Sequence, residues 1–233
     1  MGLFDMFRRD EDIKTTRSAL DEANNPDGSD DAVTRMILQL TRVGIDGVGP
    51  FDGARRIAEK AREKVSGTEE AVERVIGQHL AGGAVTGFVT GVGGFVTMIV
   101  AIPANVFSFY VQATRMAAAV AHLRGYDVTD PRIRTAVLLA LVGSNSADLL
   151  AKAGVTTGTH FAVDMASRNL PRPALMVIQK AVGFQILRRV GERVFARVGK
   201  LVPVAGGAIG AGVDFAMMRR IADQAKAEFP QTA

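Results

Sequence analysis

The feature that most constrains the fold is a run of 35 residues without a charged side chain, residues 80–114. Glycines recur in this run at every third or fourth position, a spacing that places them on one narrow face of a helix. They are Gly83, Gly87, Gly91 and Gly94. A glycine inside a helix costs roughly 1 kcal/mol relative to alanine. This glycine zipper therefore predicts a partner packed closely against the helix backbone.

Pro103 divides the run into two arms. Proline removes a backbone donor and disfavours the helical conformation of the residue before it, so we expect a helical hairpin. The second arm is predicted to begin at Pro103 and to end at a glycine cap, Gly125. The first arm, residues 80–102, exceeds the roughly 20 apolar residues that cross a bilayer. Three arrangements stay open: a membrane-spanning helix, a membrane-inserted hairpin, and a hairpin buried in a soluble core.

The charge of the chain is unevenly distributed. Residues 1–31 carry a net charge of −5, whereas residues 32–233 carry +9. A cationic body predicts an anionic partner, and both nucleic acid and an anionic membrane qualify. The chain has no tryptophan and only two tyrosines, which argues against stacking on bases. We therefore expect an anionic membrane surface or lipid as the partner, and no nucleic acid.

The absence of cysteine excludes disulfides and thiolate metal sites, and it agrees with a reducing compartment. Too few apolar residues precede the first charged residues at the N-terminus to form the apolar core of a secretory signal. The expected localisation is cytoplasmic, peripheral to the inner membrane or partly inserted in it.

With 233 residues, 48% of them hydrophobic, the chain can bury one substantial core. Residues 1–31 are predicted to form an acidic, flexible arm, and residues 32–233 a single helical domain. No long alternating pattern predicts a sheet, so the expected fold is all-α, a compact multi-helix bundle around the glycine-rich hairpin. Besides the hairpin, helices are predicted over residues 32–43, 54–64, 68–80, 131–142, 147–153, 173–199 and 201–229, with a loop at 44–53.

Local signals mark several helix starts. Ser66 followed by Glu69 predicts a capping box for the helix at 68–80. Thr129 or Asp130 is predicted to cap a helix that begins at Pro131.

The segment 188–200 is basic and amphipathic, which favours contact with anionic lipid. The alternative is a solvated face above a core face. The predicted membrane-contact residues are Arg188, Arg189, Arg193, Arg197 and Lys200. Gly206 and Gly210 follow at zipper spacing, so we expect this second glycine-rich helix to contact the first.

Arg115 and Asp214 stand out as charges within apolar surroundings. A buried charge is costly unless it is paired, so the two residues are predicted either to pair or to have separate roles. In the second case Arg115 grips the phosphate or carboxylate head of an amphiphile, and Tyr126 closes the pocket. The candidate ligand-binding residues are Arg115, Tyr126, Gly87, Gly91, Phe95 and Phe107.

The sequence offers few candidates for catalysis. The three histidines, His79, His122 and His160, lack metal-ligand spacing, so neither a metal nor a cofactor is predicted. A serine hydrolase could use Ser144 or Ser146 with His160 and Asp148, but no G-x-S-x-G motif is present. We therefore expect a non-catalytic protein.

Several blocks in order give the chain a wider resemblance. They are GIDGVGPFDGARRIA, the glycine zipper with its proline, VQATRMAAAVAHLRGYDVTDPRIRTAVLLAL, and KLVPVAGGAIGAGVDFAMMRRIADQAKAEF. Over residues 44–229 the chain resembles the bacterial EcsC family, which is named after a protein encoded beside an ABC exporter. The resemblance implies membrane association and brings no agreed catalytic residues.

The expected function is that of a non-catalytic, membrane-associated helical protein that binds lipid or another amphiphile at the cytoplasmic leaflet. Two alternatives remain: a hydrolase acting on a membrane substrate, and an accessory subunit of an ABC-type transporter.

Overall fold

The computed structural model describes residues 29–49, 51–81, 104–143, 146–152, 158, 160–167, 170–198 and 206–232. The fold is all-α, as the sequence predicts, with one short β-hairpin. The helices are α2 (Ser29–Gln39), η1 (Leu40–Asp46), α3 (Ala54–Arg62), α4 (Thr68–Leu80), α7 (Ala104–Leu123), α8 (Pro131–Val142), α9 (Ser146–Lys152), α10 (Phe161–Ser167), α11 (Arg172–Val198) and α12 (Gly206–Glu228). The strands are β1 (Gly47–Val48) and β2 (Phe51–Asp52), which pair antiparallel.

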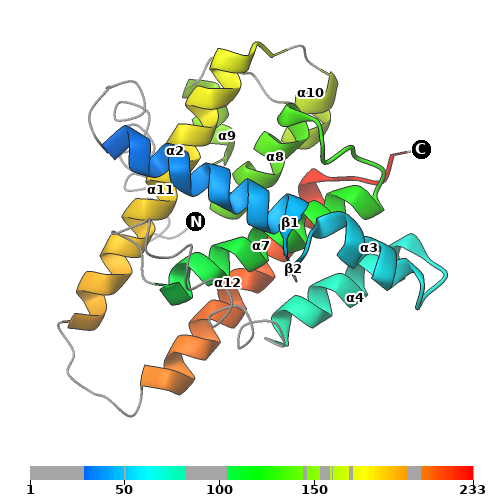
Figure 1. Cartoon of the computed structure of the whole chain (residues 1–233), viewed down its shortest axis with the longest axis horizontal. Coiled ribbons are helices and arrows are strands. Elements are labelled where there is room, and N and C mark those ends of the chain that lie inside the picture. The colour runs from blue at the N-terminus through cyan, green and yellow to red at the C-terminus, as the bar shows by residue number, and fades with distance from the viewer. Residues whose placement is uncertain are drawn as a thin grey trace, which may run out of the picture.

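Helix α7 is the centre of the molecule. Residues 110–121 are all buried, because α7 is covered by η1, α3, α4, α8 and α12 (Figure 1). A helix that is buried on every side can be apolar on most of its surface. The buried residues of α7 are mainly alanine, valine, methionine and tyrosine, with a few polar side chains among them. Residues 135–142 of α8 are also completely buried, so α7 and α8 form the inner layer of the fold.

The predicted helix boundaries around α7 and α8 are confirmed. Gly125 has a positive φ of 96°, and the N–H of Tyr126 donates to the carbonyl of Ala121 at 3.0 Å. This is the hydrogen bond of a glycine-capped helix end. At the start of α8, Asp130 Oδ1 accepts from the N–H of Arg132 at 2.8 Å, so Asp130 is the cap.

The predicted capping box at Ser66 and Glu69 is wrong. Helix α4 begins at Thr68, and its N-cap is Gly67, which makes no side-chain capping hydrogen bond. The carboxylate of Glu69 instead accepts two hydrogen bonds from Arg124. A pair with a guanidinium is stronger than a neutral capping hydrogen bond, so the tertiary contact decides the side chain's position.

The loop predicted at 44–53 contains more regular structure than expected. The chain leaves α2 as the π-helix η1 and then forms the hairpin β1–β2. Gly44 of η1 lies against α7: a Cβ there would be 2.9 Å from Thr114 Cβ and 3.1 Å from the Val111 carbonyl oxygen. The absence of a side chain at Gly44 lets η1 approach α7 this closely.

The helix ends that border the two undescribed glycine-rich segments, 82–103 and 199–205, lie in the lower half of Figure 1. They are the end of α4 at the bottom centre, and the start of α7, the end of α11 and the start of α12 towards the lower left. The first arm of the predicted hairpin lies outside the described residues, as do Gly83, Gly87, Gly91 and Gly94. None of the helices in the described ranges combines the length and apolar character needed to cross a bilayer.

Candidate functional site

Arg115 lies in the middle of α7 and is buried, with 4% of its surface exposed. Its Nη2 donates to the carbonyl of Val43 in the π-helix η1 at 3.4 Å, a long hydrogen bond. Burial lowers the pKa of Arg115, and the carboxylate of Asp52 in β2 opposes this effect. Arg115 is thus a cation held inside the fold beneath η1 and the hairpin.

Two further polar residues share the face of α7 that carries Arg115. Ser108 and Gln112 precede it by seven and three positions, a spacing that places them on one side of a helix. They are 2% and 3% exposed. We call Ser108, Gln112 and Arg115 the polar seam of α7. Most buried faces are apolar, so this row of polar groups is the most unusual feature of the central helix.

His79, in the last turn of α4, is electrostatically coupled to this seam. Its Nδ1 lies 2.8 Å from the carbonyl of Val75, so the neutral ring donates from Nδ1. Burial lowers the pKa of His79 to about 4, with the hydrogen bond to Val75 opposing and the charge of Arg115 adding to the shift. His79 is therefore neutral at physiological pH.

The predicted partner of Arg115 does not approach it. Asp214 is exposed, in the first half of α12, and forms no ion pair with Arg115. Tyr126 also lies elsewhere: its ring packs edge-to-face on Phe229, with centroids 5.2 Å apart. The structure therefore does not bring Arg115 and Tyr126 together. Phe107 is 4% exposed and belongs to the core.

The other predicted ligand residues, Gly87, Gly91 and Phe95, lie outside the described residues, as does Lys200. Arg188 is exposed on α11. Arg189, Arg193 and Arg197 follow on the last turns of the same helix. The basic segment is therefore helical as predicted up to Val198.

Helix α12 carries an exposed apolar stretch in its first half. Residues 212–216 are all exposed, including Val213 at 42% and Phe215 at 53%. Burial starts only at Met218, which is 6% exposed. Residues 212–216 therefore form an exposed and mostly apolar stretch on the surface of the described part of α12. We call residues 212–216 the exposed end of α12.

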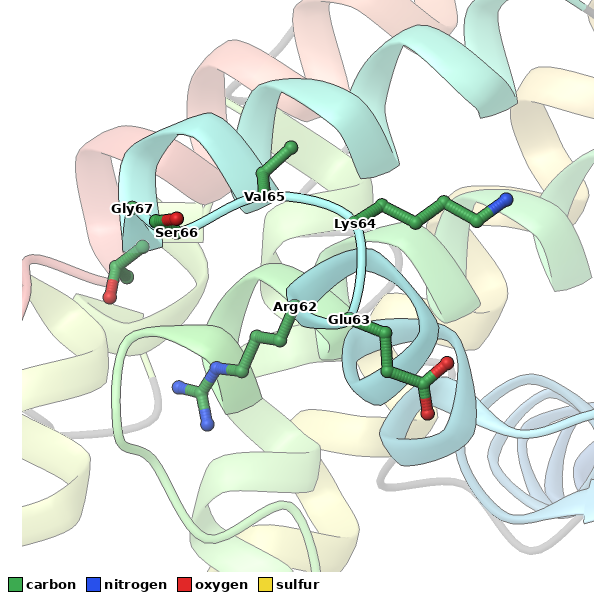
Figure 2. Close-up of a pocket in the computed structure, with 7 residues that line it drawn as sticks. Arg62, Glu63, Lys64, Val65, Ser66 and Gly67 are labelled. Atoms are coloured by element: carbon green, nitrogen blue, oxygen red, sulfur yellow. The ribbon is translucent and has the colours of Figure 1, made fainter.

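A pocket of about 470 Å³ lies at the loop between α3 and α4. Figure 2 shows the side chains of Arg62, Glu63 and Lys64 pointing away from one another around it. The guanidinium of Arg62 donates to the carbonyl of Leu123 at 2.8 Å, so its part in the fold is structural. The lining groups do not converge on a common point, as a binding site for a small molecule requires.

The remaining candidates are the serines considered for catalysis and any acidic or histidine cluster that could bind a metal. Ser146, a nucleophile candidate, is the first residue of α9 and only 2% exposed, while Ser144 lies outside the described residues. Within the described ranges, no three acidic or histidine side chains gather in a way that would hold a metal ion.

One important residue was missed by sequence reasoning. Arg124, 8% exposed, joins Glu69 of α4 to the end of α12. Its position next to the cap residue Gly125 suggested only a helix terminus. The sequence does show a basic residue in the last turn of a helix, and such a residue often donates to the unpaired carbonyls there. The distant partners of Arg124 cannot be read from the sequence.

The fold and these features define an all-α protein with a helix-wrapped central helix, a buried polar seam and one exposed apolar helix end. The chain matches the sequence model of the EcsC protein family over residues 15–230, and it belongs to that family. This confirms the resemblance and extends it towards the N-terminus. No curated protein and no solved structure matches the chain.

Proposed function

We propose that this protein is a non-catalytic, membrane-associated protein that binds an anionic lipid surface at the cytoplasmic leaflet. The binding surface is the side of the molecule where α4, α7, α11 and α12 border the two glycine-rich segments (Figure 1).

The observation that carries this proposal is the exposed end of α12. A surface helix in water normally has a polar face, and one exposed all round is expected to be polar all round. Residues 206–218 instead read GGAIGAGVDFAMM, with Asp214 as the single charge. Phe215 is more than half exposed. This composition suits a lipid environment better than water.

The charge of the neighbouring helix supports the same orientation. The last turns of α11, residues 188–198, contain four arginines and one glutamate. Figure 1 shows this end of α11 on the same side of the molecule as the exposed end of α12. Basic residues close to an anionic leaflet contribute about 1 kcal/mol each. Apolar and electrostatic contributions therefore come from two helices that follow one another in the chain.

Arg115 remains a predicted contact for a lipid head group within this proposal. A guanidinium presents a planar set of donors that suits phosphate or carboxylate, and the polar seam lies on α7, the helix that follows the glycine-rich first arm of the predicted hairpin.

Flotation with liposomes tests the proposal. We expect the protein to float with vesicles that contain phosphatidylglycerol and to remain in solution with pure phosphatidylcholine. The triple variant Arg189→Gln, Arg193→Gln, Arg197→Gln should bind roughly 100-fold more weakly, from about 1 kcal/mol per charge. A matched control removes three exposed arginines elsewhere, Arg42, Arg55 and Arg56, and should bind as the wild type does. Equal binding to both kinds of vesicle, or no binding to either, would contradict the proposal.

A further inference from the structure

We infer that α12 enters the lipid end-on, with its exposed end in one leaflet and Phe215 as the principal apolar anchor. This inference rests on the proposed function and specifies which element meets the membrane and in what orientation. It follows from a difference along α12, which is fixed to the body at its C-terminal end and is exposed over residues 212–216.

The C-terminal end of α12 is held firmly. Arg124 Nη1 donates to the carbonyls of Lys226, at 2.5 Å, and Phe229, at 2.7 Å. The Lys226 ammonium pairs with Glu73 of α4, and Phe229 is fully buried against Tyr126. Contacts from α4, from the end of α7 and from the turn after it therefore fix the direction of α12.

The N-terminal end projects from this anchored base. Helix α12 has 23 residues, and at 1.5 Å per residue it is about 35 Å long. Residues 212–216 are exposed, so towards the N-terminus the buried face of α12 ends at Met218. A helix clamped at one end presents its other end as a rigid element, which needs no reordering when it meets a bilayer.

The positions of the charges set the depth of insertion. Arg219 and Arg220 are exposed one turn after Phe215, which places them about 6–8 Å further along the axis. Arginines at the head groups would therefore put Phe215 in the upper acyl region, the depth typical of interfacial anchors. Gly206 lies about 20 Å from Arg219, which is close to half of a bilayer that is about 40–45 Å thick. The part of α12 before Arg219 is thus long enough to reach into one leaflet and too short to cross the bilayer.

The occupant of this surface is a bilayer and not a second copy of the chain, because two exposed arginines, Arg219 and Arg220, follow the apolar residues. Arg219 also pairs with Asp223 at 3.3 Å. Apolar residues followed by arginines along the helix axis match a bilayer, because the arginines attract anionic head groups while the apolar residues enter the acyl chains. Asp214 is the carboxylate that works against it, so Asp214→Asn is expected to tighten binding to anionic vesicles by a few-fold.

The absence of tryptophan from the chain allows a clean depth measurement. In Phe215→Trp the single indole should shift its emission to the blue with anionic vesicles, and lipids brominated in the upper acyl chain should quench it. Leu38→Trp is the matched control, since Leu38 is 60% exposed on α2, and its indole should stay unquenched. Phe215→Glu should weaken vesicle binding at least about ten-fold, whereas Leu38→Glu should not.

The outcomes separate the inference from the proposed function. If the wild type fails to float with anionic vesicles, both the proposed function and the inference are wrong. If it floats while the indole at position 215 stays unquenched, binding at the membrane stands and end-on insertion is overturned. Dimerisation that Phe215→Glu abolishes, without vesicle binding by the wild type, would identify the exposed end as a contact between copies and overturn the inference.

Discussion

The guanidinium of Arg124 forms a two-point pair with the carboxylate of Glu69, with 3.0 Å from Nε to Oε1 and 2.8 Å from Nη2 to Oε2. The same guanidinium donates to two carbonyls at the end of α12. Its own backbone carbonyl accepts from the N–H and the hydroxyl of Thr232, at 3.0 and 2.9 Å. One buried side chain thus joins α4, α7 and α12, and it fixes the base of the helix proposed to meet the membrane.

Removing this arginine should destabilise the protein strongly. Arg124→Met leaves the carbonyls of Lys226 and Phe229 without their donor, and we expect a loss of about 3 kcal/mol. Urea unfolding measures it. Arg56→Met is the control, because Arg56 pairs with Glu59 at the surface, where both are about half exposed, and such pairs contribute less than about 1 kcal/mol. Equal losses in the two variants would show that the Arg124 cluster has no special role.

Gly44 should tolerate no side chain. In Gly44→Ala the new Cβ would meet Thr114 Cβ at 2.9 Å and the Val111 carbonyl at 3.1 Å, so η1 must move away from α7. The expected loss is about 1–3 kcal/mol. Gly77→Ala is the matched control on α4, where nothing lies within 4 Å. Gly77→Ala should raise the free energy of unfolding by about 0.5–1 kcal/mol, because alanine has the higher helix propensity. Thermal unfolding measures both variants. Destabilisation of Gly44→Ala alone would show that close packing against α7 is the cause, and equal effects would contradict it.

Stability should fall on acidification because of His79. Its pKa is about 4 in the folded protein against 6.5 when unperturbed. The unfolded chain therefore takes up a proton on His79 below pH 6.5, whereas the folded protein does so only near pH 4. The contribution is intact above pH 6.5 and is lost towards pH 4, by at most about 3 kcal/mol.

His79→Gln tests this pH dependence, because its amide can still donate to Val75 but does not titrate. The free energy of unfolding of the wild type should decline more steeply between pH 7 and pH 5 than that of the variant. Parallel curves would mean that His79 is protonated in both states alike.

Tyr126 gives a test of a predicted ligand residue. Its hydroxyl is buried and has no hydrogen-bond partner among the described residues, and burial raises its pKa. Tyr126→Phe should keep the ring contact with Phe229 and leave stability unchanged or up to about 1 kcal/mol higher. Vesicle flotation of this variant should equal that of the wild type. A marked loss of lipid binding would instead restore Tyr126 to the ligand site.

Local signals predicted much of the fold correctly. The glycine cap at Gly125, the start of α8 at Pro131 and the course of α11 all follow from residues within one or two helical turns of each boundary. Caps, proline and hydrophobic periodicity act over such distances, so no tertiary information is needed. The π-helix η1 and the hairpin β1–β2 escaped prediction because their glycines also suit an irregular loop.

The candidate site was predictable only in part. The sequence indicated that Arg115 would be buried in an apolar helix, and the structure places it so. It could not show that Val43 and Asp52 would be the neighbours of Arg115 in place of Asp214, nor that His79 would feel its charge. Those relations depend on which helices cover α7.

The sequence by itself determined that this chain folds into helices, where most of the described helices begin and end, and that it belongs to the EcsC family. Only the tertiary structure decided that Glu69 pairs with Arg124, 55 positions away, and that Phe215 is exposed while Met218 is buried. The reason is physical: helix formation and capping are governed by neighbours in the chain, whereas ion pairing and burial are governed by neighbours in space.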